Sequence, residues 1–213
     1  MPASGLPAEL TPWAERAEQA YIADALGKPA PQPLPVDASL PEPTRAAFAA
    51  AAAAAVAARY LSVGKPRSLG IIAEDPQRAY VLWLGHRVWH QPVDVRWAGP
   101  ASASAELLAR CGGRAAPLAE ALTADVVCVD VELTVELTQV RRGSHLTLVR
   151  ADATPELAAR AICVGEAMSG AATVTLGELA AGLRDGRQLD EITLLLLHGP
   201  AGLDLARRAL ALA

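Results

Sequence analysis

The stretch Ala73-Glu74-Asp75-Pro76-Gln77 lies between an apolar run and a helical pattern, where a strand–turn–helix unit can hold a phosphate group. Such a site needs glycines, because they allow the tight turn and let backbone N–H groups approach a diphosphate at the helix start. This turn has no glycine, and its two carboxylates would repel a phosphate. Asp75 before Pro76 is instead typical of an N-cap followed by proline at the first helical position. We predict a capped structural helix here, and no phosphate site.

A dinucleotide site also needs an acid after the second strand, where the side chain binds the adenosine ribose. The strand expected from Val93 to Ala98 is followed by Gly99 and Pro100, with no acid in this position. Two separate features of a dinucleotide site are therefore missing. We predict that the chain uses no cofactor.

His86 and His90 are four residues apart, so on a helix they would share one face, as in helices that bind zinc. No Glu or Cys is placed as a third ligand, and Arg87 lies between the two histidines near the expected end of the helix. We interpret both histidines as solvated or facing the helix dipole, and predict no metal site. The three cysteines are widely spaced, so we expect reduced, buried thiols.

The length of 213 residues suits one α/β domain, or one domain plus a short N-terminal arm. Because 52% of the residues are hydrophobic and only 4% are aromatic, we expect a core of Ala, Leu and Val. The net charge of −4 offers nothing to a polyanion, so nucleic acid is not an expected partner. The longest apolar run, residues 46–56, is too short to span a bilayer, and residues 1–10 lack the pattern of a signal peptide. We expect a cytoplasmic protein without membrane contact, and the high use of Ala, Arg and Leu is typical of a GC-rich bacterial genome.

The first 43 residues are expected to form a helical arm and a connector, and residues 44–213 the main domain. Thr11 as N-cap, with Pro12 at the first helical position, starts a helix that Gly27 ends. Frequent prolines between Lys28 and Pro43 predict an extended connector.

Thr44 is expected to cap a second helix, from Arg45 to about Leu61, in which alanine dominates. So little side-chain volume stabilises a helix only when a partner approaches closely. We therefore predict that this helix is buried, either against another helix, including that of the arm, or against a second copy of the chain.

From Ser68 onward, apolar runs alternate with helical patterns, as right-handed βαβ units of a parallel sheet require. We predict an α/β fold with a mostly parallel sheet through Ser68 to Val149 and helices on both of its faces. The tail repeats this alternation, with a strand from Ile192 to Leu197 and a closing helix from Leu203 to Leu212.

Three stretches resemble the ornithine cyclodeaminase/mu-crystallin family, in the order in which the family has them. The alanine-rich segment Ala49–Ile72 is similar to the family's helix leading into its first strand, and Ala124–Asp152 is similar to its fourth strand, the loop and the next strand. Leu176–Ala211 resembles the family's ending, in which "DEITL" before a glycine-bearing turn is the most specific piece. The resemblance implies a Rossmann-like domain. It also implies dimerisation through the N-terminal third, which is much shorter here.

Members of this family cyclise ornithine to proline, reduce imines, oxidise amino acids, or bind ligand without catalysis. The resemblance places residues 73–77 on the family's glycine-containing dinucleotide turn. The arginine that grips the substrate carboxylate aligns with Ala49, while Arg45, about one turn upstream, is expected to be a solvated helix-start residue. The lysine of the family's final motif aligns with Leu196, so the substrate side also departs from the family's pattern.

Asp152 falls on the family's catalytic aspartate and is the only catalytic candidate that the resemblance supplies. It has no partner base, cofactor or carboxylate clamp in the sequence, so we expect it to cap the helix that starts at Pro155. His145 matches a strand position of the family and is expected to be structural.

Two functional hypotheses follow. The first is a non-catalytic relative, a pseudoenzyme that acts through association with a protein partner or as a homodimer. The alternative is an NAD(P)-dependent ornithine cyclodeaminase-like or imine reductase-like enzyme, or a small-ligand binder, with a remodelled pocket. Stabilisation by NAD(P)(H) would distinguish them, because a ligand of the native state raises its stability.

Overall fold

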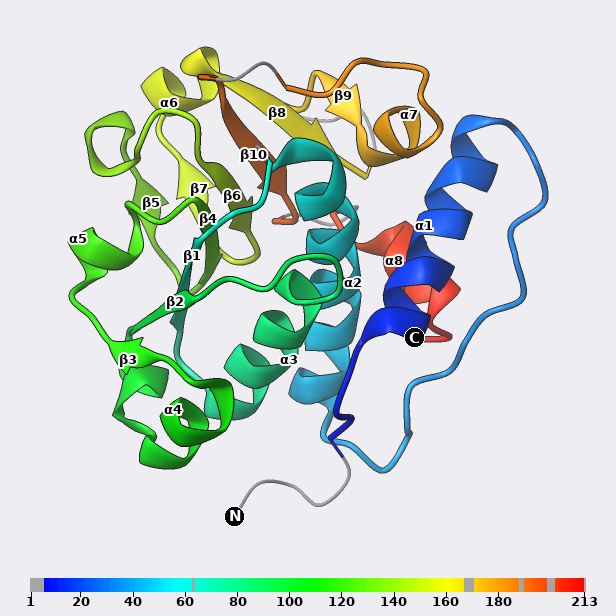
Figure 1. The fold of residues 1–213 in the computed structure, drawn as a ribbon. Coiled ribbons are helices and arrows are strands. Elements are labelled where there is room, and N and C mark those ends of the chain that lie inside the picture. The colour runs from blue at the N-terminus through cyan, green and yellow to red at the C-terminus, as the bar shows by residue number, and fades with distance from the viewer. Residues whose placement is uncertain (1–5, 63, 167–170, 188–189, 199–201, 213) are drawn as a thin grey trace.

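The computed structural model describes residues 6–62, 64–166, 171–187, 190–198 and 202–212. Eight parallel strands form one sheet in the order β3-β2-β1-β4-β6-β10-β8-β9 (Figure 1). Its strands are β1 (Ser68–Ala73), β2 (Asp94–Ala98), β3 (Arg114–Ala115), β4 (Val126–Asp130), β6 (His145–Leu148), β8 (Ala161–Gly165), β9 (Val174–Thr175) and β10 (Ile192–Leu196). Two further strands, β5 (Thr134–Val135) and β7 (Asp152–Ala153), pair with each other in a separate small sheet.

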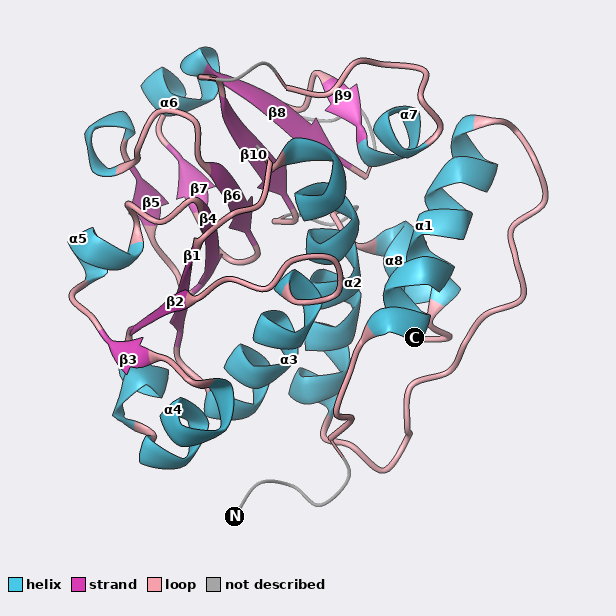
Figure 2. Cartoon of the chain, in the orientation of Figure 1, coloured by secondary structure: helices cyan, strands magenta, loops and turns pink. Residues whose placement is uncertain are grey.

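Helices cover both faces of the large sheet, as Figure 2 shows, so the predicted parallel α/β architecture is confirmed. All six residues of β1 and all five of β4 are buried, which explains why the central strands are continuous apolar runs. The helices are α1 (Thr11–Ala25), α2 (Glu42–Leu61), α3 (Pro76–His86), α4 (Ala105–Cys111), α5 (Leu118–Ala121), α6 (Pro155–Arg160), α7 (Leu176–Ala180) and α8 (Asp204–Ala209), with short 3₁₀ turns at Pro100–Ala103 and Leu137–Gln139.

The alanine-rich helix α2 is buried, as predicted, and its cover comes from the same chain. It packs against α3 on one side and α1 on the other. A Cβ added at Gly85 of α3 would overlap the backbone of Ala51 in α2, so small residues on both helices permit this close approach. The helix begins at Glu42, and the expectation that Thr44 caps it is wrong. Thr44 lies inside the first turn, where its hydroxyl donates to Gln77.

Helix α1 packs against α2, α7 and α8, and the extended connector (residues 26–41) runs back along its outer side (Figure 1). Its first residue is Thr11 and its N-cap is Leu10, so the expected capping role of Thr11 is wrong. Gly27 ends the helix in the left-handed region, with φ +61°, as predicted. None of the helices in the described ranges is both long and apolar enough to cross a membrane.

Candidate functional site

The sheet has its topological switch point between β1 and β4. From β1 the chain builds outward through β2 to β3, then returns to place β4 on the other side of β1. Open α/β sheets bind their ligands in the crevice at the carboxyl ends of the strands that flank such a point. Here the crevice lies where β1 ends at Ala73 and β4 ends at Asp130, so these two positions define the candidate site.

In the turn after β1, the side chain of Asp75 caps the helix that follows. Asp75 is the N-cap of α3, and its Oδ1 accepts a hydrogen bond of 2.8 Å from the backbone N–H of Arg78. Pro76 occupies the first turn of the helix, so the capped helix predicted from the sequence is confirmed. An internal carboxylate therefore takes a backbone donor at the helix start that a bound anion would otherwise use.

A network of ion pairs lies beside this turn, at the carboxyl ends of β1 and β4. The guanidinium of Arg78 donates to both carboxylate oxygens of Asp130, from Nε and Nη2, each at 2.8 Å. Arg150, just beyond β6, donates from Nε to Asp130 at 3.1 Å, and from Nη2 to the carboxylate of Glu74 at 2.9 Å. The four side chains thus connect β1, β4, β6 and α3 through charge-assisted bonds.

The inner half of the network, Asp130 with Arg78, is largely desolvated, whereas the side chains of Arg150 and Glu74 are partly exposed to solvent. The side chain of Asp130 is 1% exposed and that of Arg78 is 16% exposed. The hydrogen bonds that Arg78 donates to Asp130 raise the pKa of Arg78, and the bond that Arg150 donates to Glu74 raises the pKa of Arg150. Both guanidinium groups are therefore fixed as cations, and each already has a carboxylate partner. The arrangement stabilises the strand ends.

The structure separates Asp152 from this network. Asp152 is exposed at the start of β7, where it pairs with Thr134 of β5. Its expected role as cap of α6 is wrong, because Thr154 stands directly before Pro155 and its hydroxyl accepts from the backbone of Leu157. The catalytic candidate supplied by the family resemblance thus lies outside the group of side chains that meets at the crevice.

Two positions on the substrate side, Arg45 and Leu196, are not among the residues bonded in this network. Arg45 is half-buried in the first turn of α2, less solvated than expected. Leu196 ends β10 and is half-buried.

His86 is buried, so the interpretation of a solvated or dipole-facing side chain is wrong for this residue, whereas His90 is half-buried. His86 is 3% exposed, burial lowers its pKa to about 3, and within the described ranges neither ring nitrogen has a hydrogen-bond partner. The Nε2 atom of His90 lies 3.0 Å from the carbonyl oxygen of Ala58. The end of α3 packs against α2, which excludes water from the His86 ring. Among the described residues no group of three metal-ligating side chains comes together.

Two further polar side chains are buried away from the crevice. His145 is fully buried at the start of β6, where its Nδ1 lies 2.9 Å from the hydroxyl oxygen of Thr193, in keeping with a structural role. Glu166 follows β8 and accepts hydrogen bonds from the hydroxyl of Tyr21 in α1 and from the backbone N–H groups of Leu205 and Ala206 at the start of α8. Burial raises the pKa of Glu166 to about 7.

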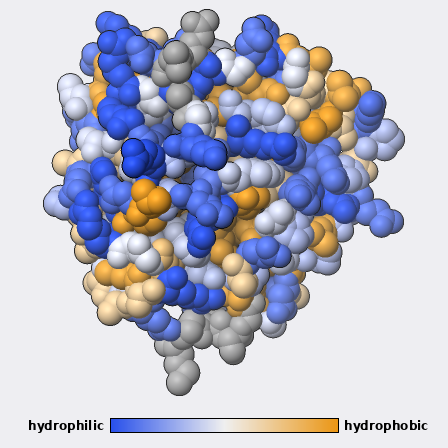
Figure 3. Space-filling view, in the orientation of Figure 1, coloured by the Kyte–Doolittle hydropathy of each residue, from blue (hydrophilic) through white to orange (hydrophobic). Residues whose placement is uncertain are grey.

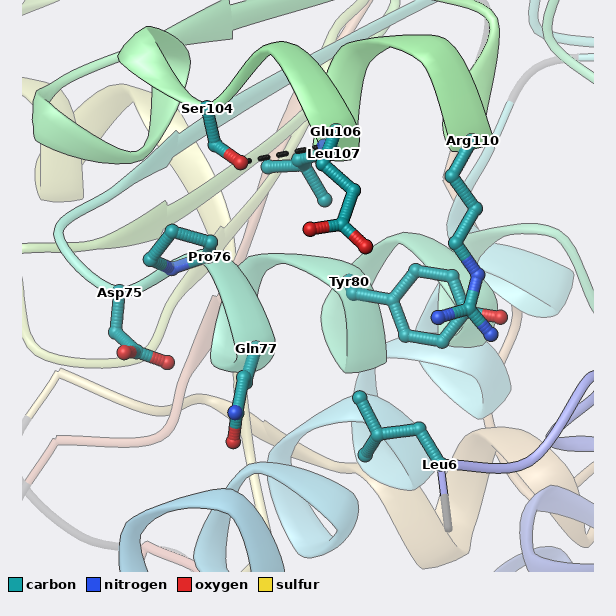
Figure 4. Close-up of a pocket in the computed structure, with 9 residues that line it drawn as sticks. All are labelled: Leu6, Asp75, Pro76, Gln77, Tyr80, Ser104, Glu106, Leu107 and Arg110. Carbon is teal, nitrogen blue, oxygen red and sulfur yellow. Dashed lines mark hydrogen bonds between the residues drawn. The ribbon is translucent and has the colours of Figure 1, made fainter. Parts of the chain in front are cut away.

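An open pocket of about 250 Å³ lies between α3 and α4 (Figure 4). The carboxylate of Glu106 projects into it, and the guanidinium of Arg110 lies 3.8 Å from the centre of the Tyr80 ring. Asp75 and Leu6 also line this pocket. Figure 3 shows that hydrophilic side chains cover much of the face seen in Figure 1, with apolar patches between them. The pocket offers separate carboxylate and guanidinium groups to a small polar molecule.

The sequence did not single out Arg78, Asp130 or Arg150. The one available signal was the position of an acid at the end of the apolar run "VVCVD" and of an arginine at the end of "HLTLVR". Parallel strands that end in charged residues at the same edge bring those residues together.

No protein-family model matches this sequence, and no curated protein matches it either. Solved structures do match. An archaeal alanine dehydrogenase dimer with bound NAD is 18% identical, with a TM-score of 0.77 over 98% of this chain and 90% of that chain. The Thermococcus litoralis Δ1-pyrroline-2-carboxylate reductase, in complex with NADH and L-proline, is 16% identical, with a TM-score of 0.76 over 99% and 93%. A probable ornithine cyclodeaminase from Bordetella pertussis Tohama I is 17% identical, with a TM-score of 0.72 over 96% and 91%.

The chain shares its fold with these proteins. The Rossmann-like fold implied by the resemblance to the ornithine cyclodeaminase/mu-crystallin family is thereby confirmed.

Proposed function

We propose that this chain is a non-catalytic, ornithine cyclodeaminase/mu-crystallin-like protein that acts through protein association and has lost the dinucleotide and substrate sites. One observation supports the proposal most directly: the ion pairs of Glu74, Arg150, Asp130 and Arg78 lie at the switch point, where a diphosphate would bind. A diphosphate in the turn would have to displace these bonds and to approach Asp75 as well.

The residues of the turn do not fit NAD(P). Glu74 and Asp75 are acids, and the two nearby arginines already neutralise carboxylates, so they offer no surplus positive charge to a diphosphate. We therefore assign no reaction step to a cofactor. The association part of the proposal rests on the resemblance and on the similarity to an alanine dehydrogenase that is a dimer.

Thermal unfolding with and without NAD, NADH, NADP and NADPH tests the loss of the dinucleotide site. A ligand that binds the native state adds RT ln(1 + [L]/Kd) to its stability, so we expect no shift in Tm at millimolar nucleotide. A triple variant, Ala73→Gly with Glu74→Thr and Asp75→Gly, removes the two acids and is expected to gain a measurable shift. Stabilisation of the unchanged chain would overturn the proposal.

Light scattering of the intact chain tests association. A self-associating protein is expected to show at least twice the 22.1 kDa of a single chain at micromolar concentration. A single-chain mass at every concentration would remove the homodimer from the proposal and leave only a different protein as partner.

The alternative function is an NAD(P)-dependent enzyme or small-ligand binder with a remodelled pocket. The pocket between α3 and α4 favours it, since Glu106 and Arg110 supply charges of both signs next to the turn after β1. The alanine dehydrogenase and the reductase named above hold NAD and NADH. Saturable binding of NADH to the unchanged chain, abolished by Arg110→Glu, is the result that would favour this function.

A further inference from the structure

A second pocket lies where the connector passes over α1 and α8. It has a volume of about 320 Å³, within the range of small-molecule sites. Six of its nine lining residues are alanine, proline or leucine. The other three, Asp24, Lys28 and Arg208, are exposed. A mostly apolar body with a few charged groups is the usual composition of a ligand pocket.

The connector forms a fixed wall of this pocket. The backbone N–H of Leu34 donates to the carbonyl of Ala209 at 2.8 Å, Arg16 donates to the carbonyl of Gln32, and the indole of Trp13 donates to the carbonyl of Pro35 at 3.4 Å. Pro31 and Pro33, which line the pocket, restrict the backbone further. A wall that is already ordered lowers the entropy that a ligand would lose on binding.

The two cations have no evident structural task. Lys28 and Arg208 make no ion pair among the interactions of the described residues. Basic side chains near helix ends often bind the last carbonyl groups. Here backbone N–H groups already occupy those carbonyls: Lys28 donates to Ala23 at the end of α1, and Ala211 donates to Arg208 at the end of α8. Both cations are therefore available to a bound anion.

We propose that this pocket binds one small amphiphilic carboxylate, with its apolar body between α1, the connector and α8 and its charged head at Lys28 and Arg208. Because two of the three charged lining side chains are cations, an anionic head is favoured over an ammonium. This site is separate from the switch-point crevice, so it stands whether or not the crevice binds a dinucleotide.

Isothermal titration of the intact chain with sodium octanoate tests the proposal, with octylamine as a probe of equal length and opposite charge. We expect saturable binding of one octanoate per chain and binding of octylamine weaker by about tenfold. The double variant Lys28→Glu/Arg208→Glu is expected to lose about tenfold in octanoate affinity. The matched control Arg142→Glu/Arg160→Glu alters the net charge equally on exposed residues outside the pocket, and is expected to bind like the unchanged chain.

A third variant separates occupancy of the pocket from surface charge. Ala30 is an exposed connector residue that lines the pocket, so Ala30→Trp is expected to fill the space and abolish octanoate binding without altering the circular dichroism. Absence of octanoate binding to the unchanged chain overturns the proposal. Equal affinity for octanoate and octylamine also overturns the proposal. Octanoate binding that persists both in Ala30→Trp and in Lys28→Glu/Arg208→Glu overturns it as well.

Discussion

At the carboxyl ends of the strands, Asp130 is fully buried and accepts hydrogen bonds from two arginines. At the amino ends, His86 is equally buried, yet the described part of the chain supplies neither of its ring nitrogens with a partner. The first edge keeps a charged group because cations surround it, and the second keeps its group neutral, with a pKa lowered to about 3.

The difference shows how one sheet can tolerate buried polar groups in two ways. A buried carboxylate that is paired with cations depends on each of its partners. A buried neutral imidazole does not depend on partners in this way, but it loses stability when pH falls below its ordinary pKa. The carboxyl edge should therefore be sensitive to substitution, and the amino edge to acid.

The largest expected effect is at Asp130. Asp130→Ala leaves Arg78 as a mostly buried cation without its carboxylate, and removal of one partner of a buried pair costs about 3–5 kcal/mol. Urea unfolding should show this loss as a lower midpoint at an unchanged slope.

Asp94→Ala serves as the matched control for Asp130. Asp94 pairs with Arg96, but its side chain is 37% exposed, so its loss should cost less than about 1 kcal/mol. Equal costs for the two substitutions would show that burial does not set the strength of the network.

The amino edge is tested by the dependence of stability on pH. His86 and His145 have pKa values lowered to about 3, so below pH 6.5 the unfolded chain binds more protons at these sites and each lowers stability by up to about 1.4 kcal/mol per pH unit. Glu166 has the opposite sign. Its pKa is raised to about 7, so between pH 7 and 4.5 the folded state binds more protons and stability rises as pH falls. The three groups together predict a net loss of about 1.4 kcal/mol from pH 6 to pH 5.

Two variants separate these contributions to the pH dependence. His86→Leu removes one destabilising group, so the free energy of unfolding should become nearly flat between pH 6 and pH 5. Glu166→Gln removes the opposing group, so the slope should steepen to about 2.7 kcal/mol per pH unit. Chemical unfolding at fixed pH values measures each slope, and identical slopes in all three proteins would contradict the assignment.

Local patterns in the sequence predicted most of the fold. The alternation of apolar runs and helical segments gave the parallel sheet, and the pair Asp75-Pro76 gave the start of α3 because an N-cap acts within one turn. The prediction was wrong where the sequence offers two capping residues. Thr154, one residue before Pro155, caps α6, whereas Asp152 had been expected to do so.

The contents of the candidate site depend on contacts that are remote in sequence. Arg78 and Asp130 are 52 residues apart, and Glu74 and Arg150 are 76 apart. No periodicity in one segment indicates such partners; they follow only once the strand order is known. The burial of His86 was missed for the same reason, since it results from the position of α2 over the end of α3.

The smallest expected effect is at Asp75, which lies at the carboxyl edge but outside the ion-pair network. Asp75→Ala removes the cap of α3, and the loss of such a cap costs about 1 kcal/mol. Ser104→Ala, at the N-cap of α4, provides a control of the same kind, because its hydroxyl accepts from Leu107. Thermal unfolding of both variants should show small and similar decreases in Tm.

Asp75→Ala also sharpens the comparison between the two edges of the sheet. Glu74 and its bond to Arg150 remain in this variant, so NADH should still give no thermal shift. A shift would mean that the cap alone excludes the dinucleotide and that the ion pairs serve only stability. If Asp75→Ala lowers the free energy of unfolding as much as Asp130→Ala does, the cap belongs to the ion-pair network. Residues that share partners affect stability together, so their separate effects do not add.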